Sequence, residues 1–159
     1  MTKSEAPEVQ AKLLALTELS GIGDKRALSL VETAGGIDSV FEAPLELFSD
    51  LHYMDKSTYN ALQNLDETVQ QYIERITSAS EDGILLLTPI DDEYPDELRR
   101  HHTPLTVFLK GNYNLLETDC LSFAGSRDAS SRALEWTQEV SSTLAVEGYS
   151  IVSGGAFGV

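Results

Sequence analysis

The hydrophobic positions change their spacing near the middle of the chain. Up to about residue 80 they recur at helical intervals, as in Leu13, Leu16 and Leu19, which indicates amphipathic helices. From Gly83 onward they form short continuous runs that are typical of buried strands. We therefore expect two domains: an all-helical one over residues 1–80 and an α/β one over residues 81–159.

Glycines and capping residues divide the helical half. The first helix is interrupted by Gly21, Ile22 and Gly23. Asp24 is the expected N-cap of the second helix, and the glycine pair at residues 35–36 ends it. The remaining helices are expected at residues 37–41, 44–49 and 56–78, the last as one continuous helix.

The order of the elements expected in the second half is typical of an α/β domain. Strands are expected at residues 84–87, 106–109, 121–124 and 149–152. Between the last two lies a helix that Ser130 or Ser131 caps and that runs to about Glu147. Its expected inward positions are Ala133, Trp136, Val140, Leu144 and Ala145.

Strand, helix and strand in this order make a βαβ unit with a right-handed crossover. Together with the two preceding strands, this unit is about half of a doubly wound sheet. The predicted fold class is thus α/β, with a helical domain followed by a truncated Rossmann-like parallel sheet. A strand that has just emerged in such a sheet needs further neighbours, so we expect the chain to be a fragment or a truncated product.

Two glycine-containing loops follow the last two expected strands. Gly125, Ser126 and Arg127 combine a close backbone approach, a hydroxyl and a guanidinium fork, beside a helix N-terminus that Ser130 would cap. Residues 153–158 form the second loop, and its candidates are Ser153, Gly154, Gly155 and Gly158. Ligands of open α/β sheets bind at the strand ends where both loops lie. Either loop alone would also suit an ordinary tight turn, whereas the pair favours a phosphate site.

A third candidate lies in the helical half. Gly21, Ile22 and Gly23 between two helices are the pattern of a helix–hairpin–helix, whose backbone N–H groups contact a nucleic-acid phosphate without reading bases. Lys25 and Arg26 add paired positive charge. An ordinary packing role is the alternative, because acidic residues crowd residues 32–55.

Charge and composition narrow the possibilities. The net charge is −15, from 26 acidic and 11 basic side chains, which counts against non-specific nucleic-acid binding but leaves room for a local site. No apolar run is long enough to span a membrane, and residues 1–10 lack the features of a secretory signal. The single cysteine, Cys120, is expected to be a buried thiol. A cytoplasmic location fits these observations.

Several chemistries lack the residues they need. Neither the dinucleotide fingerprint G-x-G-x-x-G nor the P-loop pattern is present. The neighbouring pair His101 and His102 does not point at one ion, and residues 91–93 (Asp-Asp-Glu) are expected to be an exposed turn. We therefore expect no metal, no cofactor and no catalytic triad.

Four ordered motifs resemble a known family. They are residues 94–98 (Tyr-Pro-Asp-Glu-Leu), 105–111 (Leu-Thr-Val-Phe-Leu-Lys-Gly), 124–130 (Ala-Gly-Ser-Arg-Asp-Ala-Ser) and 152–158 (Val-Ser-Gly-Gly-Ala-Phe-Gly). Their order and spacing resemble the signature of DprA/Smf, the DNA-processing protein A family. Residues 1–80 resemble the N-terminal SAM-like or helix–hairpin–helix region of that family.

The resemblance implies a Rossmann-like fold that binds single-stranded DNA, protects it, loads RecA onto it in natural transformation and forms dimers when full length. It implies no catalytic activity. Where the family usually carries Tyr-Gly, this chain has Arg132 and Ala133; Arg132 is either a further phosphate contact or a surface replacement. The candidate DNA- or phosphate-binding residues are Gly125, Ser126, Arg127, Ser130, Arg132, Ser153, Gly154, Gly155 and Gly158.

Two other interpretations remain at the level of sequence. The first interpretation is a hydrolase. Rossmann-like proteins of the LOG group use glycine-rich loops to hold nucleoside monophosphates and cleave their glycosidic bond. The second is a truncated fragment without function.

Overall fold

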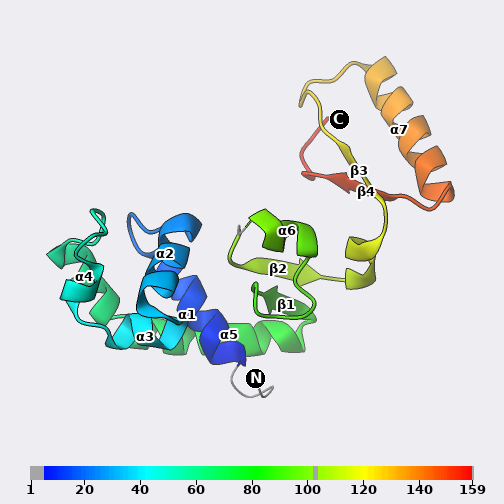
Figure 1. Ribbon diagram of the computed structural model, residues 1–159. Coiled ribbons are helices and arrows are strands. Elements are labelled where there is room, and N and C mark those ends of the chain that lie inside the picture. Colours follow the sequence, from blue (N-terminus) through cyan, green and yellow to red (C-terminus); the bar gives the residue numbers. More distant parts are fainter. Residues whose placement is uncertain (1–5, 102–103, 159) are drawn as a thin grey trace. The chain divides into compact units, whose positions relative to one another are not determined.

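The computed structural model of the chain describes residues 6–101 and 104–158 (Figure 1). It divides into two compact units, Met1–Gly111 and Asn112–Val159. His102, Thr103 and Val159 lie outside the described residues, as does the start of the polar N-terminus. Within the described residues, no helix is long and apolar enough to cross a membrane.

The first unit is built mainly from helices. A buried apolar cluster holds them together, with Leu16, Leu30 and Phe48 fully enclosed. The longest helix of this unit, α5, packs along α1 (Figure 1). The helices are α1 (Ala6–Glu18), α2 (Asp24–Ala34), α3 (Ile37–Glu42), the 3-10 helix η1 (Leu45–Phe48), α4 (Lys56–Gln63) and α5 (Asp66–Glu81).

Two details of the helical half differ from the sequence-based expectation. The segment expected as one helix is two, because the backbone leaves helical geometry at Asn64, whose side chain donates to the carbonyl of Asn60. Asn side chains compete for backbone groups in this way and favour helix ends. The N-cap of α2 is Gly23 and not Asp24, which is already the first helical residue. Its carboxylate lies in the first turn, where the helix dipole favours negative charge.

A strand pair completes the first unit. β1 (Ile84–Leu87) and β2 (Val107–Lys110) pair antiparallel, with Leu86 opposite Phe108, and the short helix α6 (Asp96–His101) lies between them in the chain. β1 also packs against α5. The expectation that these strands extend the parallel sheet is therefore wrong. They form an antiparallel pair of their own, from Ile84 opposite Lys110 to Leu87 opposite Val107.

A polar network fastens that connection to α1. The carboxylate of Asp91 accepts hydrogen bonds from the backbone N–H and the hydroxyl of Thr88, at 2.7 and 2.8 Å, and from the amide of Gln10 at 3.2 Å. The Gln10 amide also donates to the carbonyl of Leu86 at 2.7 Å. Asp91 is thus half-buried and structural, whereas the neighbouring Asp92 and Glu93 are exposed as expected for a turn.

Arg99 and Tyr94 hold the other side of the same connection. The Arg99 guanidinium donates to the carbonyls of Pro89, Asp91 and Tyr94, and its centre lies 5.5 Å from the Tyr94 ring. Tyr94 is 2% exposed and its hydroxyl donates to the carbonyl of Pro104. Burial raises the pKa of Tyr94, and the charge of Asp24 raises it further.

The second unit is a βαβ arrangement, as the sequence predicts. A 3-10 helix, η2 (Tyr113–Glu117), precedes β3 (Cys120–Phe123), α7 (Ser131–Val146) and β4 (Ser150–Ser153). β3 and β4 are parallel neighbours, with Leu121 opposite Ile151, and α7 is the crossover between them (Figure 1).

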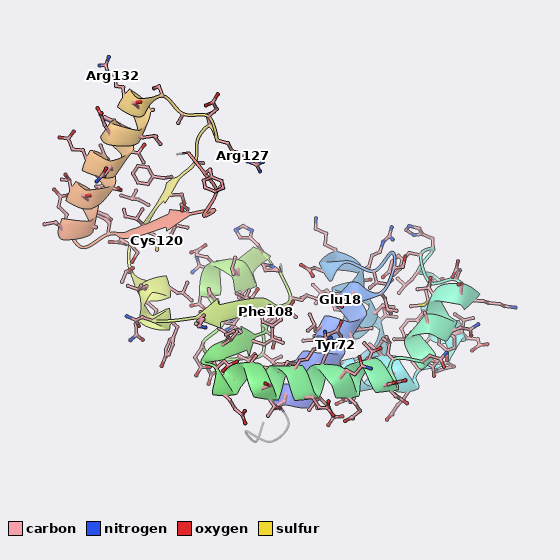
Figure 2. All side chains as sticks on the ribbon, turned by 180° about the vertical axis from the view of Figure 1, so that it is seen from behind. Glu18, Tyr72, Phe108, Cys120, Arg127 and Arg132 are labelled. Atoms are coloured by element: carbon pink, nitrogen blue, oxygen red, sulfur yellow. The ribbon has the colours of Figure 1, made fainter. Side chains whose placement is uncertain are left out.

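Three residues of this unit are more open than expected, and one of them is Ala145 on α7, which is exposed although the helical pattern predicts an inward position. The Cys120 thiol is exposed rather than buried (Figure 2), and Trp136 on α7 is 59% exposed although its position in the helical pattern predicts an inward side chain. In the described part of the unit, two strands and one long helix are too few to cover both faces of the sheet.

Candidate phosphate-binding loops

The first loop leads from β3 to α7. Gly125 follows the strand after one residue, and the Ser126 hydroxyl accepts a hydrogen bond from the backbone N–H of Asp128 at 3.2 Å. Ser130 then caps α7, because its hydroxyl accepts from the backbone N–H of Ala133 at 3.3 Å. Serine is a preferred N-cap since it satisfies an N–H group that has no partner within the helix. The loop therefore ends at the N-terminus of α7, which is the positive end of the helix dipole.

The second loop follows β4 and uses the same device. The Ser153 hydroxyl accepts from the backbone N–H of Gly155 at 3.3 Å, two residues further on. Gly155 adopts a left-handed conformation with φ +64°, which residues that carry a Cβ rarely adopt. In both loops a serine thus fixes the turn through its oxygen and keeps its own hydroxyl hydrogen to donate to a ligand.

The two loops touch through Gly158. A Cβ built on Gly158 would meet the carbonyl oxygen of Ser126 and would lie 2.9 Å from the Cα of Arg127. Gly158 also has φ +92°. Contact this close leaves no room for a side chain, so glycine is required at this position on two independent grounds. The geometry joins the two predicted loops into one site.

Two hollows open beside the joined loops. One, of about 340 Å³, is lined by Gly125 together with Ser153, Gly154, Gly155 and Gly158. The other, of about 350 Å³, is lined by Gly125, Ser126 and Ser130, with Trp136 from α7 as a further wall. Gly125 belongs to both. The structure therefore brings together seven of the nine predicted residues around two adjoining hollows.

The remaining two candidates are the arginines. Arg127 and Arg132 are the basic residues of the second unit, and both lie at the end where α7 begins. Figure 2 shows their side chains pointing in different directions, and neither lines a hollow. Among the described residues, neither is within ion-pair distance of a carboxylate. Their exposed guanidinium groups are thus available to an anionic ligand at the rim of the loops.

The helical unit holds the third candidate, the hairpin between α1 and α2. Ile22 is 2% exposed and packs into the core, while Gly21 turns the chain with φ +82°. The Arg26 guanidinium donates to the Gly21 carbonyl at 2.6 Å and lies 5.0 Å from the ring of Tyr53. Arg26 therefore braces the hairpin, whereas Lys25 is exposed beside it and forms no ion pair within the described residues.

Sequence reasoning identified the loops but not everything around them. The open indole of Trp136 was expected to face the core, and the network of Gln10, Thr88 and Asp91 was not foreseen. A helical pattern identifies the face of a helix, but it does not say whether another element covers that face. In the described parts of the chain, no group of three or more His, Cys, Asp or Glu side chains gathers as a metal site would require.

Comparison with known proteins gave one family. Residues 85–159 match the family model described as DNA recombination-mediator protein A. The matched segment begins within β1 and includes both loops and α7. No curated protein matches the chain.

Proposed function

We propose that this chain holds single-stranded DNA by its phosphates and passes it to RecA, because residues 85–159 match the family model of DNA recombination-mediator protein A. The family match supports a DNA-processing role in recombination. The choice of a single strand as the ligand, of the two loops as its site and of RecA as the partner is our proposal.

The contact of Gly158 with Ser126 and Arg127 carries this proposal. It unites two loops that each offer backbone N–H groups and a serine hydroxyl, next to a helix N-terminus. Such groups bind phosphate oxygens and carry no information about base sequence. A phosphate-based mode of binding therefore suits a protein that must hold any strand presented to it.

The acidic surface supports a local mode of binding over a broad one. With a net charge of −15, the chain as a whole repels a polyanion. Arg127 and Arg132 supply positive charge at the loops, and Lys25 beside the hairpin offers a second contact in the helical unit. We expect modest affinity that falls as salt screens these few cations.

A direct binding comparison tests the ligand. The full chain is titrated against a labelled single strand and against the corresponding duplex, and anisotropy is measured at low salt. We expect tighter binding of the single strand, because its flexible backbone can follow the two loops. Equal or tighter binding of the duplex would contradict the proposal.

Free nucleotides separate this function from the hydrolase interpretation. A nucleoside monophosphate carries the same phosphate group, so it would compete for the same loops. We expect a long single strand to displace it readily and no free base to appear on incubation. Release of base would instead indicate a LOG-type hydrolase.

The partner is tested separately. The chain is bound to a single strand and RecA is added, and the rate of filament formation is followed by fluorescence of a labelled strand. A competing single-strand-binding protein is present in both reactions. We expect filaments to form faster on the strand that carries the chain than on the strand without it. An unchanged rate would remove RecA from the proposal and leave strand binding standing.

A further inference from the structure

The single tryptophan of the chain forms a wall of one hollow at the candidate site. Trp136 lies on α7 and lines the hollow of about 350 Å³ together with Gly125, Ser126 and Ser130. It is 59% exposed. A large aromatic ring that lines a hollow and remains open to solvent is available to contact a ligand.

Trp136 is more exposed than three other apolar side chains that follow the same helical spacing on α7. Ala133, Val140 and Leu144 follow helical spacing along the face that packs on the sheet, and all three are half-buried. Trp136 is more exposed than Leu134, which is 43% exposed on another face of the same helix. The indole is thus not needed to attach α7 to the strands.

The hollow has two chemically different sides. Gly125 and the hydroxyls of Ser126 and Ser130 form a polar side suited to a phosphate, and Trp136 forms an aromatic side. Asp128 also lines the hollow, and its carboxylate repels a phosphate placed close to it. The glycine and serine side is the one with polar groups for a phosphate, which leaves the indole for the apolar part of the ligand.

A nucleotide of a single strand has the same two parts. Proteins that hold single strands combine phosphate contacts with aromatic side chains on which bases stack, and every base has a face that can stack. We propose that Trp136 is a stacking platform for one base of the bound strand. This inference rests on the proposed function, because it names the part of the DNA that the same site contacts in addition to phosphate.

The size of the effect follows from measured stacking contributions. Alanine substitution at a stacking aromatic costs about 1–3 kcal/mol per base, which is about a 5- to 150-fold loss of affinity. Because the chain has one tryptophan, its indole fluorescence, excited selectively over that of the tyrosines, reports on this position alone. A base that stacks on the indole is expected to quench that fluorescence.

The experiment compares bases with bare phosphates. The full chain and its variants are titrated against a labelled thymidine oligonucleotide and against a labelled abasic oligonucleotide of equal length, which carries the phosphates but no bases. Affinity is measured by the anisotropy of the label, and in the parent the indole fluorescence is followed as well. The variants are Trp136→Ala, Trp136→Phe and, as a matched control, Leu134→Ala, which removes an exposed apolar side chain that does not line the hollow.

We expect the thymidine strand to quench the indole of the parent and the abasic strand to leave it nearly unchanged. Trp136→Ala should lose at least about 5-fold in affinity for the thymidine strand and stay within about 2-fold for the abasic one. Trp136→Phe should fall between parent and alanine, and Leu134→Ala should match the parent.

Two results would overturn the inference. If the parent binds the thymidine strand without any change in indole fluorescence, or if Trp136→Ala weakens both strands equally, Trp136 does not stack, and the proposed function stands. If the parent binds neither strand, the proposed function fails and this inference fails with it.

Discussion

Gly158 lies against the carbonyl oxygen of Ser126, so the last described residue of the second loop touches the middle of the first. The two residues are far apart in sequence and follow different strands of one parallel pair. Parallel neighbours end at the same edge of a sheet, which is why loops that follow them can meet. The candidate site is a consequence of this pairing.

Replacing Gly158 tests whether the loops must meet. Gly158→Ala would force a Cβ onto Ser126 and Arg127 at φ +92°, and a side chain in that conformation alone costs about 1–2 kcal/mol. We expect weaker binding of single-stranded DNA and faster hydrogen exchange in residues 150–153. Gly148→Ala is the matched control, because it introduces a side chain at a similar φ of +98°, outside both loops, with nothing within 4 Å of the added Cβ. If both variants behave like the parent, the contact has no bearing on the site.

Two neighbouring cations of the hairpin are predicted to have different roles. Arg26→Ala removes the hydrogen bond to Gly21 and the stacking on Tyr53, so we expect a loss of about 1 kcal/mol in the stability of the helical unit, measured by denaturant unfolding. Lys25→Ala should leave stability unchanged within about 0.5 kcal/mol. If the hairpin contacts phosphate, Lys25→Ala should weaken DNA binding instead. A Lys25→Ala variant with unaltered binding would favour a packing role for the hairpin.

Tyr94 gives the first unit a predicted sensitivity to alkaline pH. Burial raises the pKa of Tyr94 in the folded state, so the stability linked to its neutral hydroxyl is fully present below its unfolded pKa of about 10 and is lost as the pH rises through the folded value. Tyr94→Phe should cost about 0.5–1.5 kcal/mol at neutral pH through the lost bond to Pro104, yet lose less stability at high pH.

Unfolding at pH 7.5 and pH 11 measures this difference. The hydrogen bond to Glu18 raises the pKa of Tyr72, so part of the alkaline loss should persist in Tyr94→Phe. Tyr113→Phe is the control, since Tyr113 is exposed in the second unit. An alkaline loss of the same size in Tyr94→Phe and in the parent would contradict the role given to Tyr94.

Local signals predicted most of the elements. The alternation of apolar runs and glycines located β1, β3, β4 and α7 to within one or two residues, because strand length, turns and caps are encoded by neighbouring residues. Ser130 was among the two expected caps of α7 and is the one that the structure uses. The break at Asn64 was missed because apolar spacing on both sides of it fits one continuous helix.

Long-range relationships could not be predicted from spacing. Nothing in residues 84–87 tells whether that strand pairs with residues 107–110 or joins the parallel sheet, since both depend on the path of the connection between them. The exposure of Trp136 and Cys120 likewise depends on which elements cover the sheet. At the site, the sequence predicted two loops, whereas the role of Gly158 as their point of contact required the backbone geometry.

The salt dependence of Arg127→Ala tests the central claim most directly. Affinity of the full chain for a labelled single strand is measured from 50 to 200 mM salt, with Arg75→Ala as a control that removes the same charge from the helical unit. If Arg127 contacts a phosphate, its removal should weaken binding and reduce the slope of log affinity against log salt by about 0.7 to 1, and Arg75→Ala should leave the slope unchanged. An Arg127→Ala variant that binds like the parent at every salt concentration would contradict the assignment of these loops as the DNA-binding site.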